Sequence, residues 1–318
     1  MKKISTRALL ALILFECLVS SGSAYATDAQ DLSIVAKIND IKYSNTATLD
    51  PKKEIAKLFA DQTCYSTKHN LDKLKTIYAD SYTNSDGFDK NTYLEMVQKT
   101  WDQYPSTTYS TLVKGSYIDG DYAIVQAQET AYGLTQDFVD NVKGHGVIES
   151  DSCTLYYLQK IGPNWKITSS SPIYENTSLK YGSAKTMNIS LSAPSQVKSG
   201  DNYTATLYTA IPPHSVILGS ITNESISYPQ KTPKDVFRAV KRDGSLERVL
   251  KANSENHNEY AVASLGITKA SVEENNKVNI GISGMAFILT RVNVVPQIVN
   301  TIQETNDKKA DNEKDKHQ

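Results

Sequence analysis

The sequence predicts an α+β cone, in which three helices pack on a curved antiparallel sheet, followed by an all-β sandwich domain. Helix start signals and apolar spacings of three and four residues fill positions 50–104. From Thr107 onward the apolar residues alternate with polar ones instead. After residue 185, short alternating segments recur with turns between them, which is typical of a β-sandwich.

The first part of the chain carries three helix start signals. Asp50 precedes Pro51, and an N-cap followed by proline at the first helical position marks a helix start. Asn70 and Asp89 are the N-caps of two further segments, and Pro105 ends the last one. The apolar faces expected to point inward are Ile55, Leu58, Phe59 and Gln62; Leu71, Leu74, Ile77 and Tyr78; and Tyr93, Leu94, Val97 and Trp101.

Residues 1–26 have the pattern of a secretory signal peptide. A basic start precedes an apolar run over positions 8–15, and Ala24 and Ala26 place small residues where a signal peptidase recognises them. Glu16 ends the apolar run, which is shorter than the roughly 20 residues of a membrane-spanning helix. We therefore expect export to the periplasm or the medium, with cleavage after Ala26 and no stable membrane anchor.

The charge of the chain argues against a polyanionic partner. The net charge is −1, and removal of the signal peptide makes it −3, with acidic and basic side chains interspersed along the chain. A nucleic-acid-binding protein would concentrate Lys and Arg on one surface. No histidine or cysteine pair has the spacing of a metal motif. We expect no nucleic acid, no metal and no cofactor.

Two cysteines, Cys64 and Cys153, remain after signal cleavage, in a compartment that permits disulfides. A bridge between them would tie the first helix to a distant strand and contribute about 4 kcal/mol through loop closure. Two buried free thiols are the alternative, because cysteine is often buried as a small apolar residue. The sequence leaves both alternatives open.

The alternating segments after Thr107 predict a meandering antiparallel sheet. Residues 109–128 form a long hairpin around the turn Asp119-Gly120-Asp121. Residues 147–169 form another around Ile161-Gly162-Pro163-Asn164. Such a sheet, curved around three helices, would enclose a pocket.

This order of elements resembles the nuclear-transport-factor-2-like (SnoaL-like) superfamily over about residues 48–175. The resemblance rests on Ile77-Tyr-Ala-Asp80, on Phe88-Asp89 at a helix start, and on the hairpin Tyr157-Leu-Gln-Lys-Ile-Gly-Pro-Asn-Trp-Lys-Ile167. It implies a cone-shaped domain with an interior pocket. Members include ketosteroid isomerase, polyketide cyclases, dehydratases and binding domains without activity, so the family fold does not fix the function.

The resemblance makes Asp86 the candidate general base, because Tyr78 to Asp86 resembles the isomerase stretch that ends in the catalytic Asp. The isomerase also needs an oxyanion-stabilising tyrosine and a protonated acid on the sheet. Gln62 stands at the tyrosine position, and no acid-bearing strand stands out. A local explanation for Asp86 is an Asx turn leading through Gly87. The candidate pocket lining is Gln62, Tyr65, Tyr78, Tyr82, Phe88 and Trp101.

The rest of the chain divides by composition. Residues 27–47 are a lead segment, 176–184 a polar linker, and 297–318 a charged tail that is predicted to be disordered. In between, Ala193-Pro194 and Ser199-Gly-Asp-Asn-Tyr-Thr-Ala-Thr-Leu207 resemble a bacterial immunoglobulin-like β-sandwich over about 185–296. Its expected strands are 187–194, 203–208, 216–221, 224–228, 236–240, 246–250, 259–268 and 277–295.

Two functions of different classes follow from these expectations. The favoured one is an exported bacterial non-catalytic binding or protein-interaction protein, for an unknown small ligand or envelope protein, which dimerises through the sheet of its first domain. The alternative is a secreted isomerase- or hydratase-type enzyme with Asp86 as its general base. Gln62 at the tyrosine position favours the first function.

Overall fold

The computed structural model describes residues 50–139, 142, 144–272 and 278–297, and the following statements concern these residues. The predicted signal peptide, the lead segment to residue 47 and the charged tail beyond residue 297 lie outside them. Within the described part, no helix combines the length and the apolar character needed to cross a membrane.

The helices begin where the sequence predicts. The carboxylates of Asp50 and Asp89 accept hydrogen bonds from the Lys52 and Thr92 N–H groups, and the Asn70 side chain accepts one from Lys73 N–H. Each cap satisfies an N–H group that has no partner inside its helix. The bounds are α2 Pro51–Thr67, α3 Leu71–Leu74 and α4 Lys90–Gln103.

The strands form a ten-stranded sheet and a three-stranded sheet, both mostly antiparallel. Their bounds are β1 Tyr78–Asn84, β2 Thr108–Asp119, β3 Tyr122–Val139, β4 Gly144–Ile161, β5 Asn164–Gly182, β6 Ile189–Ser192, β7 Gln196–Lys198, β8 Asn202–Thr209, β9 Ser215–Ser225, β10 Arg238–Ala239, β11 Ser245–Lys251, β12 Glu259–Val272 and β13 Val278–Val295. The large sheet has the order β10-β9-β12-β13-β5-β4-β3-β2, with β1 beside β5 and β7 beside β13, and the small sheet has the order β11-β8-β6.

The second helix is shorter than predicted, because the chain leaves it for a strand. The sequence predicts Ile77 and Tyr78 on its inner face, but Tyr78 begins β1, which pairs in parallel with β5. Tyr78 and Tyr82 still point inward from β1, whereas Asp80 is exposed. Spacings of three and four residues suit a helix, and here pairing with a strand distant in sequence overrides that local preference.

The second half does not form the separate immunoglobulin-like sandwich that the sequence predicts. Strand β13 pairs with β5 from Gly284↔Gly182 to Thr290↔Asn176, so it extends the first sheet. The predicted linker 176–184 is the end of β5 followed by a 3-10 helix, Ser183–Thr186. The strands predicted at 203–208, 246–250 and 259–268 are present as β8, β11 and β12.

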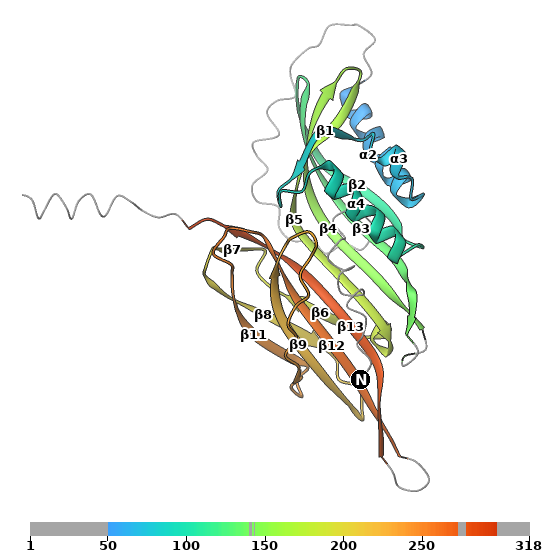
Figure 1. Ribbon diagram of the computed structural model, residues 1–318, viewed down its shortest axis with the longest axis vertical. Coiled ribbons are helices and arrows are strands. Elements are labelled where there is room, and N and C mark those ends of the chain that lie inside the picture. Colours follow the sequence, from blue (N-terminus) through green and yellow to red (C-terminus); the bar gives the residue numbers. More distant parts are fainter. Residues whose placement is uncertain (1–49, 140–141, 143, 273–277, 298–318) are drawn as a thin grey trace, which may run out of the picture.

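The large sheet has two faces, and different elements cover them (Figure 1). The inner face of β2–β5 packs against α2, α3 and α4, and its core extends to Tyr260 on β12 and Leu289 on β13. The outer face of β9, β12 and β13 packs against the three-stranded sheet, through residues such as Leu207, Leu250 and Ile288. The fold is therefore a mostly antiparallel sheet with three helices on one face, and not a cone followed by an independent sandwich.

Candidate functional site

A row of polar side chains crosses the inner face of the large sheet. Strand pairing places Glu129 opposite Ser152, and Ser152 opposite Glu175. Arg291 lies one residue beyond the last β5–β13 pair, Thr290↔Asn176, which continues the row past Glu175, and it pairs with Tyr260 on β12. All five residues are buried. A row that includes three charged side chains therefore runs through the core and joins the two halves of the chain.

Each of the two glutamates in the row is only partly satisfied by hydrogen bonds. Tyr156 OH donates to Glu129 Oε1 at 2.6 Å, and Tyr260 OH donates to Glu175 Oε2 at 2.9 Å. Glu129 Oε2 and Glu175 Oε1 are buried and accept no hydrogen bond of good geometry from the described residues. Because buried polar atoms are nearly always paired in folded proteins, these two oxygens require an explanation.

Burial raises the pKa of both carboxyls to about 7. At Glu129 the hydroxyls of Tyr156 and Thr154 oppose this effect of burial on the pKa. At Glu175 the Arg291 charge and the Tyr260 hydroxyl also lower the pKa, whereas the charges of Asp86 and Glu129 raise it. A carboxyl with a pKa near 7 exists in both protonation states at neutral pH, so it can take up or release a proton during a reaction.

A small cavity, called here the inner cavity, lies beside this row. Its volume is about 10 Å³, which is near the smallest space that holds one water molecule. It is lined by Tyr93, Ser152, Thr154, Tyr156, Ser170, Pro172 and Glu175.

Three of the predicted pocket residues meet near the inner cavity. Gln62 Nε2 donates to Tyr78 OH at 2.8 Å, and Tyr78 OH lies 3.0 Å from the hydroxyl of Tyr93, which lines the cavity. The Tyr82 hydroxyl lies 2.7 Å from Ser170 Oγ, also in the lining. Gln62, Tyr78 and Tyr82 therefore belong to a polar, tyrosine-rich interior next to the cavity.

The other three predicted lining residues lie elsewhere. Trp101 Nε1 donates to Tyr109 OH at 2.9 Å, and its ring stacks on His69 at the end of α2. Tyr65 is half-buried at the edge of the core. Phe88 lines a different cleft, near the second half of the chain.

The loop that carries Asp86 is an Asx turn, but the residue that makes the turn is Asn84. Asn84 Oδ1 accepts hydrogen bonds from the backbone N–H groups of Asp86 and Phe88, at 3.1 and 2.9 Å. Gly87 follows with a φ of +85°, a conformation that favours glycine. The turn leaves the Asp86 side chain directed toward the C-terminal half.

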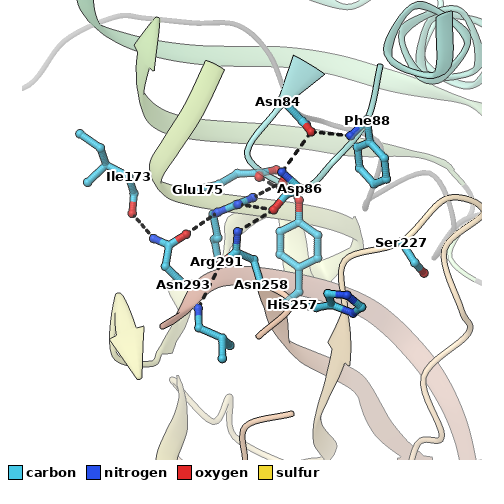
Figure 2. A network of polar contacts seen from close by, with 12 residues as sticks. Asn84, Asp86, Phe88, Ile173, Glu175, Ser227, His257, Asn258, Arg291 and Asn293 are labelled. Carbon is cyan, nitrogen blue, oxygen red and sulfur yellow. Dashed lines mark hydrogen bonds and ion pairs between the residues drawn. The ribbon is translucent and has the colours of Figure 1, made fainter. Parts of the chain in front are cut away.

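Asp86 forms a buried ion pair with Arg291 (Figure 2). Arg291 Nη2 and Nη1 donate to its two carboxylate oxygens at 2.6 and 3.0 Å, and Asn258 Nδ2 donates to Oδ1 at 2.7 Å. The side chains of Arg291 and Asp86 are 0% and 2% exposed. A carboxylate that accepts three such hydrogen bonds is a poor proton acceptor, so the geometry gives Asp86 the role of counterion.

Two larger openings lie outside the core. A cleft of about 390 Å³ next to the ion pair has Phe88 on one side and Tyr228 and His257 on the other. An open groove of about 670 Å³ lies at the starts of β1 and α4. The Lys90 ammonium in that groove already donates to Tyr78 O and to Asp80. Neither opening brings together several unpartnered ionisable groups among the described residues.

Both cysteines are free thiols in the structure. Cys153 is buried on β4, where its sulfur accepts a hydrogen bond from Gln126 Nε2 at 3.3 Å, and Cys64 is half-buried on α2. Of the two alternatives left by the sequence, the structure has the free thiols and not the bridge. The residues described here include no group of three or more side chains arranged to bind a metal.

Comparison with known proteins finds likeness in structure only, since no family model and no curated protein matches the chain. A hexachlorocyclohexane dehydrochlorinase of type 2 is 14% identical, with 38% of this chain and 83% of that chain covered and a TM-score of 0.32. A nuclear-transport-factor-2-like protein from Salmonella enterica is 12% identical, with 38% and 88% covered and a TM-score of 0.32. A proposed dehydratase of the nuclear-transport-factor-2-like family from Streptomyces avermitilis is 10% identical, with 38% of this chain and 96% of that chain covered and a TM-score of 0.33. These structural neighbours are nuclear-transport-factor-2-like proteins, and they match little more than a third of the chain.

The sequence-based prediction did not include Glu129, Glu175 and Arg291, although the sequence carries a signal for each. Glu129 follows Ala123, Val125 and Ala127 in the same alternating phase, which is the buried phase of β3. Glu175 likewise stands in the buried phase of β5, and Arg291 stands in a part of β13 that is buried on both faces. A single charged residue in the inward phase of an apolar strand would have identified each of them.

Proposed function

We propose that the protein is an exported enzyme of the isomerase or dehydratase type, in which two glutamates transfer protons: Glu175, which lines the inner cavity, and Glu129, which accepts a hydrogen bond from the lining residue Tyr156. One observation carries the proposal: two wholly buried carboxyls with pKa values near 7 lie on the same polar row, and each has an oxygen that accepts no hydrogen bond of good geometry from the described residues. Groups with strongly perturbed pKa values in a cavity are candidates for catalysis.

The carboxyls are separated by one strand, so they can act on opposite sides of a small ligand. Glu129 on β3 and Glu175 on β5 flank Ser152 on β4, and strand spacing puts their backbones about 10 Å apart. With one carboxyl ionised and the other protonated, the first removes a proton from carbon and the second donates one to oxygen. This division of work suits a proton shift beside a carbonyl, or the loss of water from a β-hydroxy carbonyl compound.

The inner cavity has room for a water molecule but not for such a substrate. The proposal therefore requires the ring of tyrosines around Tyr93 to move when a substrate enters. The water-sized volume next to Glu175 is the place where a water released or added in the reaction would lie.

The favoured sequence-based function, a non-catalytic binding protein, finds no support in this arrangement. A structural core gains nothing from two carboxyls that burial makes costly to ionise, and glutamine would fill the same space without that cost. The alternative fits better, but with Glu175 and Glu129 as the proton-transfer groups in place of Asp86.

A deuterium-exchange experiment tests the proposal with a panel of compounds in place of a single substrate. The mature protein is incubated in D₂O with small enones and β-hydroxy carbonyl compounds, and NMR follows the exchange of the protons next to the carbonyl. We expect exchange above the background rate for at least one compound. Glu175→Gln and Glu129→Gln should each reduce the rate by about 100-fold or more, the usual contribution of a general acid or base.

The matched control is Glu259→Gln. Glu259 is also buried and accepts a hydrogen bond from a tyrosine, Tyr203, but it lies against the three-stranded sheet, away from the inner cavity. This variant should exchange protons at the rate of the parent protein. Background exchange with every compound, or equal rates in the Glu175→Gln and parent proteins, would contradict the proposal.

We also propose that a second copy of the chain covers the outer face of β2, β3 and β4, which the three-stranded sheet leaves bare. Five large side chains on this face, between 39% and 62% exposed, form the outer patch: Leu112, Tyr117, Tyr122, Ile124 and Tyr157. Together they expose on the order of 500 Å², a large part of the about 800 Å² that each partner buries in a stable interface.

The shape and charge of the outer patch suit a copy of itself. Tyr117, Ile124 and Tyr157 pair across three strands, and the next row begins with Gly115, where a Cβ would have no atom within 4 Å. The large side chains of the first row can therefore fill the open space above Gly115 in a second copy, and the reverse contact follows from a two-fold axis. The patch itself carries no charged side chain, and the net charge of −3 without the signal peptide opposes association little.

Sedimentation velocity at protein concentrations between about 1 and 100 μM tests the proposed dimer, because the dissociation constants of moderate interfaces lie near this range. We expect a dimer that Tyr117→Lys converts to a monomer with an unchanged circular dichroism spectrum. Tyr208→Lys is the control, because Tyr208 is 50% exposed on the separate three-stranded sheet. A monomer at every concentration, or a dimer that survives Tyr117→Lys, would disprove the proposed interface; a complex with another protein in place of the dimer would also count against it.

A further inference from the structure

Arg291 lies between two carboxyls that come from different parts of the chain. It binds Asp86, from the loop after β1, through both Nη atoms, and its Nε donates to Asn293 Oδ1 at 2.8 Å. The polar row places it next to Glu175 on β5. Among the described residues, nothing donates a hydrogen bond of good geometry to Glu175 Oε1. The positive charge of Arg291 is therefore directed to Asp86.

We propose that Asp86 is a positioning residue that engages the charge of Arg291 and thereby keeps Glu175 in its neutral, proton-donating form, so that the ion pair with the C-terminal half completes the catalytic site. The inference rests on the proposed function and assigns a part in it to residues outside the inner cavity. Neither Asp86 nor Arg291 lines the inner cavity, whereas Glu175 does, so both act through Glu175.

The physical reason is competition for one charge in a region without water. A buried guanidinium needs one negative partner, and a second buried carboxylate would remain uncompensated. Because Asp86 already supplies the negative charge, Glu175 is more stable as the neutral acid. If Asp86 lost its charge, ionisation of Glu175 would supply the missing partner of Arg291.

The surroundings of Glu175 contain few other groups that could decide its protonation. Arg291 on β13 and Tyr260 on β12 favour the ionised form, whereas Asp86 and Glu129 favour the neutral form. Tyr260 OH donates to Glu175 Oε2 and remains in place in the variants below. Asp86 and Arg291 are therefore the residues to substitute in a test.

Infrared titration of the free protein tests the inference without any substrate, because a protonated buried carboxyl has a separate C=O stretching band. The Glu175→Gln and Glu129→Gln variants assign the two bands. We expect Asp86→Asn to lower the titration midpoint of Glu175 by about 1 to 3 pH units, the usual effect of an opposite charge that has become available. Arg291→Gln should raise the midpoint, and Arg291→Lys should bring it back toward the parent value.

The opposite signs distinguish this role from a merely structural one, since loosened packing would shift both variants in the same direction. The band of Glu129 is an internal control, because Arg291 does not contribute to the pKa of Glu129. If Arg291→Gln does not fold, the titration midpoint of Glu175 in Asp86→Asn is sufficient to test the inference. An unchanged or raised midpoint of Glu175 in Asp86→Asn would overturn the inference, even if the deuterium exchange confirms the enzyme. A lowered midpoint without exchange on any compound would support the pair and count against the proposed function.

Discussion

Replacing Arg291 by methionine is expected to lower the free energy of unfolding by about 3–5 kcal/mol, the usual cost of removing one partner of a buried ion pair. The substitution leaves the Asp86 carboxylate in the core without its countercharge, although Asn258 still donates to it. The effect should be large because both side chains are almost completely shielded from water. Urea unfolding, followed by circular dichroism, measures it.

A double substitution tests the explanation itself. If the cost arises from the uncompensated carboxylate, Asp86→Asn combined with Arg291→Met should be more stable than Arg291→Met alone. Lys57→Met is the control, because the exposed pair Lys57–Asp61 should contribute less than about 1 kcal/mol. A loss of under 1 kcal/mol in Arg291→Met, or a double variant less stable than either single one, would show that the pair does not join the halves as inferred.

The parts of the fold that the sequence predicts correctly are the locally encoded ones. Asp50, Asn70 and Asp89 cap helices because a side-chain oxygen next to free N–H groups is a property of a few adjacent residues. The hairpin turns at Gly120 and Gly162 have positive φ values, which glycine adopts without strain. Such features depend on short segments, so a single sequence is sufficient to find them.

The contacts that join the N-terminal and C-terminal halves of the chain could not be predicted from local sequence patterns. It depends on β13 pairing with β5 and on Arg291 reaching Asp86, and in both cases the partners are far apart along the chain. Neither Asp86 in a turn nor Arg291 in a strand has a local pattern that names its partner. Composition instead suggests a boundary at residues 176–184, because the polar side chains of β5 there resemble a linker.

The candidate site lies between these two cases. The inward spacing of Gln62, Tyr78 and Tyr82 is readable in the sequence, and these residues do meet around Tyr93. The place of Glu129 in the buried phase of β3 is equally readable, but the family resemblance directs attention to an aspartate in a turn. Glu175 is harder to place, because two irregularities between β4 and β5 shift the alternation along the hairpin.

Stability should fall as the pH rises from about 4.5 to 7, because of Glu129 and Glu175. In the unfolded chain these carboxyls ionise near their ordinary pKa of 4.5, whereas in the folded protein burial raises the pKa to about 7. Between these values the folded state holds more protons than the unfolded state, so raising the pH favours unfolding. The loss is complete above the folded pKa and amounts to on the order of 3 kcal/mol for each carboxyl.

Urea unfolding at pH 5 and pH 8 of the parent protein, Glu129→Gln and Glu175→Gln checks this expectation. Each glutamine variant should show a smaller loss of stability between the two pH values, since glutamine does not titrate. His69 acts in the opposite direction, because burial lowers its pKa below 6.5, but it is the same in all three proteins and cancels in the comparison. An equal change in all three would mean that the carboxyls are ionised already at pH 5. Glu129 and Glu175 would then both carry a charge in the folded protein at neutral pH. Neither could act as the neutral acid that the proposed catalysis and the proposed role of Asp86 require.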